Sequence, residues 1–196
     1  MNLPNKLTMM RMVLIPFMMF FYLAEFIPHG IGKLVALGIF IVAALTDLLD
    51  GKIARKYNLV TNFGKFMDPI ADKLLTSAML FMLVADETIP HPYGVIVITI
   101  IIAREFMVSG LRLLAANRGI VMAADMWGKV KTCVQMVAIP VCVVLAYLIN
   151  CGYNIADGVI LTFKVISYVG IGLATVLTVI SGINYLIKNR QCFKEE

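Results

Sequence analysis

Long apolar segments dominate this sequence, and they constrain its fold more than any other feature. Of the 196 residues, 61% are hydrophobic and only 15% are charged, whereas a soluble domain carries about a quarter charged residues. A helix needs about 20 mostly apolar residues to cross a bilayer. The sequence therefore predicts an all-α polytopic membrane protein, with one membrane-embedded domain over residues 1–196. Six transmembrane helices are expected, at about residues 7–26, 33–57, 64–85, 93–117, 127–149 and 159–187.

The positive charges are distributed unevenly along the predicted bundle. Of the 17 Lys and Arg residues, Lys33 and Lys164 fall on one side and Arg104 falls near mid-membrane, while the other 14 lie in or next to the side that carries both termini. Cytoplasmic loops of membrane proteins are enriched in Lys and Arg. We therefore predict cytoplasmic termini, and we attribute the net charge of +5 to membrane topology rather than to nucleic-acid binding.

Four aspartates lie within or beside the apolar second and third segments. Asp47 and Asp50 are three residues apart, and Asp68 and Asp72 are four apart, so each pair shares one face of a helix. Because these two helices are antiparallel, we expect Asp50 to face Asp68 near the surface and Asp47 to face Asp72 deeper in the membrane. Asp68 precedes Pro69, and proline is tolerated in the first turn, so we expect Asp68 close to the start of its helix.

The chemistry of these carboxylates predicts a metal site. Charged groups at membrane depth are costly unless their charge is compensated, and carboxylates without Cys or His partners favour hard ions such as Mg²⁺, Mn²⁺ or Ca²⁺. Four carboxylates can hold two ions, an arrangement that stabilises the attacking and leaving oxygens of phosphoryl transfer. The small residues Gly51, Ala54 and Gly64 leave room for a bulky ligand, and Arg55 can contact phosphate. A metal-bound pyrophosphate group fits this set of residues.

These spaced residues resemble the signature of the CDP-alcohol phosphatidyltransferases, a family of six-helix membrane enzymes that are usually homodimers and require Mg²⁺ or Mn²⁺. Family members displace CMP from a CDP-alcohol with the hydroxyl of a second alcohol. Every position of the pattern is present, as Asp47-x2-Asp50-Gly51-x2-Ala54-Arg55-x8-Gly64-x3-Asp68-x3-Asp72. The resemblance implies three roles: metal binding by Asp47, Asp50, Asp68 and Asp72; general-base catalysis by Asp72; and binding of the CDP group by Asp50, Gly51, Ala54, Arg55 and Gly64.

A second charged cluster lies on the fourth and fifth segments and their connection. Only Glu105 and Asp125 are acidic there, so we expect a net positive pocket for an anionic, phosphorylated acceptor. The stretches LPNKLTMMRMVLIPF and IIAREFMVSGLRLLAANRGIVMAADMWGKVKTCVQM resemble bacterial phosphatidylglycerophosphate synthases. That resemblance implies CDP-diacylglycerol and sn-glycerol 3-phosphate as substrates, and a bacterial cell membrane with the active site facing the cytoplasm. The candidate acceptor-binding residues are Arg104, Arg112, Arg118, Lys129 and Lys131.

Several alternative interpretations stay open at this stage. Another acceptor, such as inositol phosphate, needs the same phosphate pocket. A divalent-cation carrier would explain intramembrane aspartates, but it would not explain Arg55 beside them or the second basic cluster, and a non-catalytic scaffold would leave the buried charges unexplained. Arg104 is either a functional residue or part of an internal ion pair with Glu105. Arg11 is expected to extend to the membrane interface. Small residues that favour close helix contact are Gly170, Gly172 and Gly182.

Overall fold

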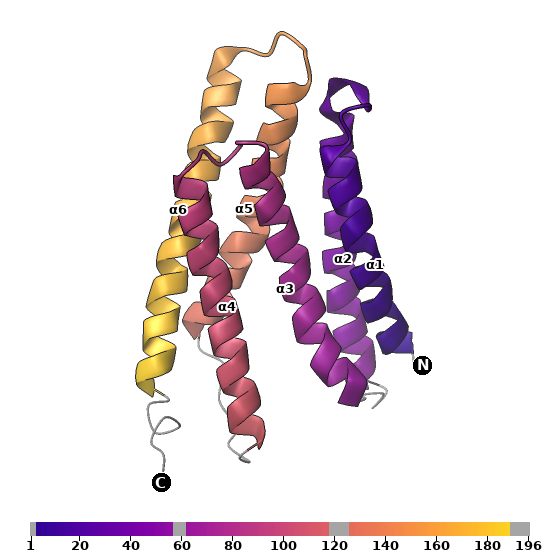
Figure 1. Ribbon diagram of the computed structural model, residues 1–196, viewed down its shortest axis with the longest axis vertical. Helices are drawn as coiled ribbons and strands as arrows, with labels where there is room; N and C mark the ends of the chain where they lie inside the picture. The colour runs from indigo at the N-terminus through magenta and orange to yellow at the C-terminus, as the bar shows by residue number, and fades with distance from the viewer. Residues whose placement is uncertain (1–2, 57–61, 118–125, 189–196) are drawn as a thin grey trace.

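The computed structural model describes residues 3–56, 62–117 and 126–188, and its regular structure in these ranges is entirely helical. All six helices that the sequence predicts are present, and their bounds differ from the expected ones by only a few residues (Figure 1). A short 3₁₀ helix, η1 (Pro28–Gly30), connects the first two. The long helices are α1 (Leu3–Leu23), α2 (Ile31–Lys56), α3 (Asn62–Ala85), α4 (Tyr93–Asn117), α5 (Met126–Asn150) and α6 (Asp157–Lys188).

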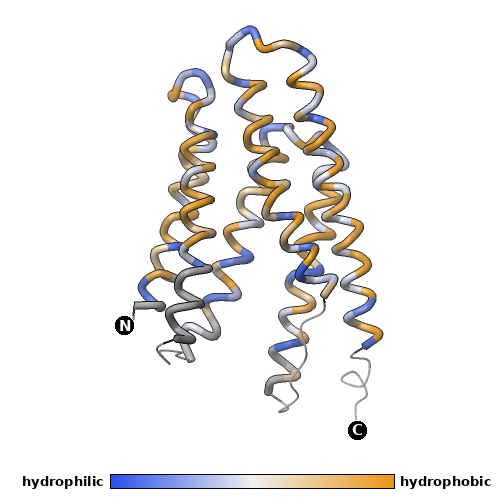
Figure 2. Tube along the Cα trace, turned by 180° about the vertical axis from the view of Figure 1, so that it is seen from behind, coloured by the Kyte–Doolittle hydropathy of each residue, from blue (hydrophilic) through white to orange (hydrophobic). Residues whose placement is uncertain are grey.

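The outer surface of the bundle is apolar, as expected for contact with lipid. Phe17, Phe20 and Val137 are each more than half exposed, and they are typical of many large apolar side chains on the outside. Hydrophobic residues cover most of each helix, and hydrophilic residues lie in the upper loops and in the lower parts of the helices (Figure 2). Among the described helices, all but α3 are long and apolar enough to cross a membrane on their own. The chain is therefore a polytopic membrane protein.

The helices pack as two groups of three. In the first group α1 packs against α2 and α3, and in the second α6 packs against α4 and α5. Contacts of α5 with α2, and of α3 with α4 and α5, join the groups. The start of α1 and the end of α6 lie at the same end of the bundle (Figure 1). The shared core includes Met18, Phe40, Leu83, Ile139 and Ile171, all at most 3% exposed.

The start of α3 differs from the prediction. This helix begins at Asn62, so Asp68 is its seventh residue rather than one of its first, and Pro69 lies inside it. Asparagine is a favoured residue type at helix starts, and at 3.6 residues per turn the helix completes more than one turn before Asp68. Asp68 and Asp72 therefore project from within a helix that continues in both directions beyond them.

The glycines of α6 serve packing within the chain. A Cβ atom on Gly170 would lie 3.1 Å from the Cβ of Ala138 on α5, and one on Gly182 would lie 3.2 Å from the Cγ of Arg104 on α4. These two positions therefore permit close contact, as the sequence predicts. Around Gly172, no atom of the described residues lies within 4 Å of the corresponding position.

Candidate active site

Asp47 of α2 meets a buried arginine of α1. The Nη1 of Arg11 donates to the Oδ1 of Asp47 over 2.6 Å. The Arg11 side chain is 0% exposed and that of Asp47 is 36% exposed. The expectation that Arg11 extends to the membrane interface is wrong, because α1 packs against α2 and provides a carboxylate partner inside the bundle. A fully buried guanidinium requires such a partner, since an unpaired buried charge is strongly destabilising.

Asp68 of α3 receives a hydrogen bond from the same face of α1. The Oγ1 of Thr8, which is 1% exposed, donates to the Oδ1 of Asp68 over 2.6 Å. Thr8 and Arg11 are three residues apart and so lie on one face of a helix. The sequence analysis did not assign either residue to the site. Their three-residue spacing, in a helix that is mostly apolar beyond Asn5 and Lys6, is the signal that would have pointed to them.

Asp72 lies where the two groups of helices meet. Among the described residues, no side chain or backbone group donates a hydrogen bond to its carboxylate, although it interacts electrostatically with Asp47, Glu105 and Arg11. A partly buried carboxylate without a donor contributes nothing obvious to folding. Asp72 also lines a small cavity of about 30 Å³ between α3, α4 and α5, together with Thr76, Glu105, Thr132, Gln135 and Met136.

The chemistry of these donors fits a hard divalent cation. Thr8 and Arg11 both contact Oδ1 atoms, and no hydrogen bond from a described residue reaches the Oδ2 of Asp47 or Asp68. Oxygen ligands of this kind suit Mg²⁺ or Mn²⁺. Within the part of the chain that the structure describes, no three carboxylate, imidazole or thiol groups converge as metal ligands. The side chain of Asp50 lies outside the described residues, and the four-carboxylate site stays a prediction.

The residues expected to bind the CDP group are placed only in part. Gly51, Ala54 and Arg55 belong to the last turns of α2, the helix that carries Asp47, but the side chains of this stretch are outside what the structure describes. Gly64 is buried in the first turn of α3. The helix assignments put all four residues at the same end of the bundle as the start of α1 (Figure 1).

Two of the basic candidates, Arg104 and Lys131, lie inside the second group of helices. The Nη2 of Arg104 donates to the Oγ of Ser181 on α6 over 2.5 Å. A Cβ atom on Gly128 of α5 would lie 3.2 Å from that same Nη2, so this glycine leaves room for the guanidinium. Lys131 is 0% exposed and forms an ion pair with Glu105 of α4. Of the two interpretations of Arg104, its pairing with Glu105 is not the one observed, since Glu105 pairs with Lys131.

The other basic candidates are more exposed. Arg112 and Lys129 are both exposed, and the guanidinium carbon of Arg112 lies 5.6 Å from the ring centre of Tyr185, a buried residue of α6. Such a cation–π contact restrains the arginine while its charge stays accessible. Arg118 lies outside the described residues. Since Lys131 is neutralised by Glu105, the exposed positive charge among the described candidates comes from Arg112 and Lys129.

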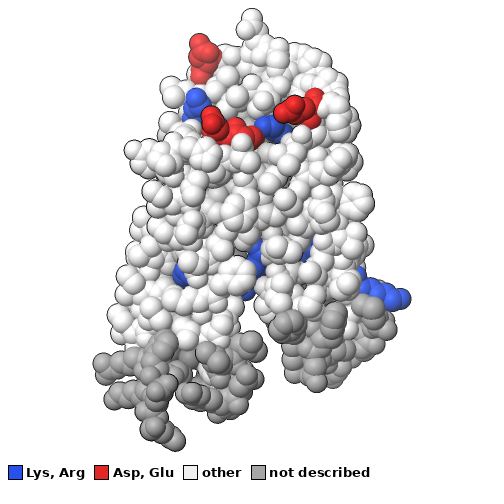
Figure 3. Space-filling model, viewed as in Figure 1, with Lys and Arg blue, Asp and Glu red and all other residues white. Residues whose placement is uncertain are grey.

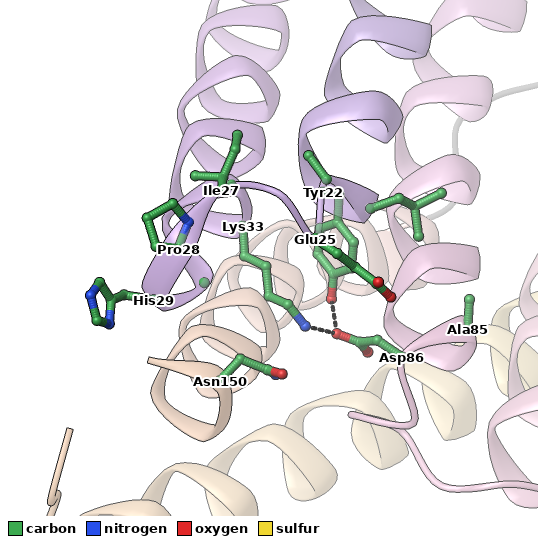
Figure 4. A pocket seen from close by; sticks show the side chains of 13 residues that line it. Tyr22, Glu25, Ile27, Pro28, His29, Lys33, Ala85, Asp86 and Asn150 are labelled. Carbon is green, nitrogen blue, oxygen red and sulfur yellow. Dashed lines mark hydrogen bonds and ion pairs between the residues drawn. The ribbon is translucent and has the colours of Figure 1, made fainter. Parts of the chain in front are cut away.

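A larger cavity, of about 470 Å³, lies at the opposite end of the bundle (Figure 4). On its wall, the Oδ2 of Asp86 accepts hydrogen bonds from the Oη of Tyr22 over 2.7 Å and from the Nζ of Lys33, while its Oδ1 accepts one from the backbone N–H of Thr88 over 3.1 Å. On the face shown in Figure 3, the visible acidic side chains gather at this end. Asp86 is thus fully bonded, and this network joins the ends of α1, α2 and α3.

Comparisons with known proteins confirm the resemblance to this family. A family model described as CDP-alcohol phosphatidyltransferase matches residues 1–180. A Bacillus subtilis (strain 168) protein named CDP-diacylglycerol--glycerol-3-phosphate 3-phosphatidyltransferase is 40% identical over 210 residues, which cover 98% of this chain and 97% of the relative. A Rickettsia felis protein of the same name is 36% identical over 184 residues, covering 94% and 93%. A Mycobacterium tuberculosis protein named "Probable phosphatidylglycerophosphate synthase" is 37% identical over 191 residues, covering 95% and 81%.

Proposed function

The chain belongs to the CDP-alcohol phosphatidyltransferase family, and we propose that it transfers a phosphatidyl group from CDP-diacylglycerol to sn-glycerol 3-phosphate, giving phosphatidylglycerophosphate and CMP. The observation that carries this proposal is the complete aspartate pattern on α2 and α3, next to a basic cluster on α4 and α5. Relatives named for this reaction are similar over nearly the whole chain. The site thus combines carboxylates for a metal-bound diphosphate with cations for an anionic acceptor.

In this proposal the aspartates of α2 and α3 have two roles, metal binding and general-base catalysis. Asp47, Asp50, Asp68 and Asp72 hold the divalent metal, two ions of Mg²⁺ or Mn²⁺, which when bound neutralises diphosphate charge and stabilises the leaving CMP. Asp72 also takes the proton of the acceptor hydroxyl. It suits this role because no donor among the described residues competes for its carboxylate. The CDP group is bound by Asp50, Gly51, Ala54, Arg55 and Gly64.

The proposed reaction is a substitution at phosphorus. The acceptor oxygen forms a bond to the phosphorus that carries the diacylglycerol, and the bond from that phosphorus to the CMP oxygen breaks. The hydroxyl proton passes to the Asp72 carboxylate, which removes the positive charge that would otherwise build up on the attacking oxygen. Arg55 contacts the phosphates of the CDP group, for which its guanidinium offers paired donors.

The acceptor phosphate is assigned to the basic cluster of α4 and α5. Arg112 is the strongest candidate in it, because its charge is exposed and its position is restrained by Tyr185. Arg104 lies deeper, bonded to Ser181. Lys131 brings no net charge because Glu105 neutralises it. The full proposed set is Arg104, Arg112, Arg118, Lys129 and Lys131.

We further propose that the protein is a homodimer in a bacterial cell membrane, with its termini and active site on the cytoplasmic side. The excess of Lys and Arg on the terminal side supports this orientation. The start of α1 and the end of α6 share that side with the aspartate-bearing turns (Figure 1). A cytoplasmic site also suits water-soluble products and acceptors such as CMP and glycerol 3-phosphate.

The test is CMP release by purified protein in detergent with CDP-diacylglycerol and Mg²⁺. Glycerol 3-phosphate, inositol phosphate and serine are offered in parallel, and we expect release with glycerol 3-phosphate alone. Release with another acceptor would keep the reaction class and overturn the acceptor. If folded protein released no CMP with any acceptor but carried labelled Mn²⁺ into proteoliposomes, the carrier interpretation would replace the enzyme.

Removal of metal is the second test of the proposed site. We expect excess EDTA to abolish CMP release, and added Mg²⁺ or Mn²⁺ to restore it, because the carboxylates alone would repel the diphosphate. The measurement is initial rate against free metal concentration. Unchanged turnover in EDTA would contradict the assignment of Asp47, Asp50, Asp68 and Asp72 as metal ligands.

A further inference from the structure

Helix α1 lies outside the aspartate pattern, yet it contacts two of its members. Thr8 donates to Asp68 and Arg11 donates to Asp47, each over 2.6 Å. Both donors are essentially buried, at 1% and 0% exposure. Hydrogen bonds of this length to a carboxylate are charge-assisted and strong. A single face of α1 therefore binds the carboxylates of two different helices.

Through its packing, α1 connects α2 and α3. α1 packs against α2 and against α3 more extensively than α2 and α3 pack against each other. The relative placement of Asp47 and Asp68 is consequently set mainly through α1, with a smaller contribution from direct contact of their own helices. Each donor occupies an Oδ1 atom, and within the described residues no hydrogen bond reaches either Oδ2. Each carboxylate is thus held by a hydrogen bond at its Oδ1, which leaves its Oδ2 without a hydrogen bond from the described residues.

We propose that Thr8 and Arg11 are positioning residues, which hold Asp68 and Asp47 in the orientation needed to bind a divalent metal. This inference rests on the metal site of the proposed function. Side chains that ligate a metal are usually held by hydrogen bonds from outer residues, and losing such a partner costs roughly 10–100-fold in metal affinity or activity. Arg11 also offsets the mutual repulsion of carboxylates that have to approach one another to share a metal.

Thr8 offers the cleaner test of the two residues. Replacing Arg11 removes a positive charge as well as a hydrogen bond, and these changes act on cation binding in opposite directions. Thr8→Val removes only the hydroxyl and keeps the side-chain shape, whereas Thr8→Ser keeps the hydroxyl. The matched control is Thr99→Val on α4, where the hydroxyl is exposed and donates over 2.7 Å to the carbonyl of Val95 in the same helix.

The experiment measures Mn²⁺ binding to the full chain in detergent by the electron paramagnetic resonance signal of free Mn²⁺, with no substrate present. We expect Thr8→Val to raise the Kd roughly 10–100-fold, with Thr8→Ser and Thr99→Val close to the unmodified protein. CMP release by Thr8→Val should require a higher Mn²⁺ concentration, and its kcat should be largely recovered at saturating metal. If Thr8→Val does not fold, as judged by its unfolding transition, Thr8→Ala takes its place.

The outcomes separate this inference from the function on which it rests. If the unmodified protein binds Mn²⁺, Asp68→Asn does not, and Thr8→Val binds as tightly as the unmodified protein, the positioning role is overturned and the metal site stands. If Thr8→Ser is as weak as Thr8→Val, the hydroxyl is not the cause and the inference again fails. If Asp68→Asn binds Mn²⁺ as tightly as the unmodified protein, the proposed metal site itself is overturned.

Discussion

The aspartates at the two ends of the bundle differ in how far the protein satisfies them. Asp86, at the end with the larger cavity, accepts hydrogen bonds from Tyr22 and Lys33 at one oxygen (Figure 4). Its other oxygen accepts one from the backbone N–H of Thr88. Asp72, which lies inside α3 toward the other end of the bundle, receives no hydrogen bond from any described residue. Two side chains of the same type therefore differ in their hydrogen bonding: Asp86 is bonded at both oxygens, and Asp72 receives no hydrogen bond from the described residues.

This difference in hydrogen bonding indicates which aspartates serve function and which serve stability. Asp47 and Asp68 fall between the two extremes, since each accepts one hydrogen bond at Oδ1 from α1. A carboxylate whose bonding capacity is filled by the protein contributes to stability, while one left partly unfilled costs free energy until a ligand completes it. We therefore expect substitutions of Asp86 to change stability and substitutions of Asp72 to change activity.

The largest expected effect is on turnover in Asp72→Asn. The substitution keeps the shape of the side chain but removes a general base and one anionic metal ligand, so we expect the rate of CMP release to fall by at least roughly 10²–10⁴-fold. Because no described residue bonds to this carboxylate, the unfolding midpoint in detergent should hardly change. Near-normal CMP release from this variant would remove Asp72 from the catalytic role.

A smaller effect on substrate affinity is expected in Arg112→Ala. Loss of a charge-assisted contact to phosphate is worth about 1.5–3 kcal/mol, so the KM for glycerol 3-phosphate should rise about ten- to a hundredfold, with little change in the KM for CDP-diacylglycerol. Steady-state kinetics with each substrate varied in turn measures this. Lys164→Ala, which removes an exposed basic residue of α6 outside the cluster, is the control. An unchanged acceptor KM would place the phosphate elsewhere.

The smallest effect on activity is expected in Asp86→Asn, which should instead lower the stability of the protein. The substitution leaves the Lys33 ammonium, whose side chain is only 11% exposed, without its counter-charge. We expect a loss of about 1–3 kcal/mol in the free energy of unfolding, with CMP release per folded molecule nearly unchanged. Glu87→Gln, which neutralises an exposed carboxylate in the same loop, should leave the unfolding midpoint unaltered.

The sequence predicts the helices well because membrane-spanning helices have a strong and simple signal. Apolar segments bounded by turn residues predicted all six helices, although α3 is the one described helix that is not apolar enough to span a membrane on its own. The place of Asp68 within α3 was predicted less well. Pro69 suggested a helix start close to Asp68, but the residues before it also suit a helix, and α3 extends back to Asn62.

Side-chain partners were harder to predict, because spacing gives the face of a helix but not the neighbour that the face meets. Arg11 was expected to extend to the interface, whereas α1 turns it inward onto Asp47. Glu105 was considered as a partner for its sequence neighbour Arg104, yet consecutive residues point in different directions on a helix, and Glu105 meets Lys131 of α5 instead. Such pairings depend on how α1 and α5 are rotated and shifted against their neighbours.

The most direct test compares four variants in one assay: Asp47→Asn, Asp68→Asn, Asp72→Asn and Asp86→Asn. CMP release from CDP-diacylglycerol and glycerol 3-phosphate is normalised to the folded fraction of each purified protein. We predict that the first three variants lose most of their activity and that Asp86→Asn retains it. If Asp86→Asn were as inactive as the others, or if Asp72→Asn were active, the number of hydrogen bonds that the protein makes to a carboxylate would not distinguish active-site aspartates from structural ones.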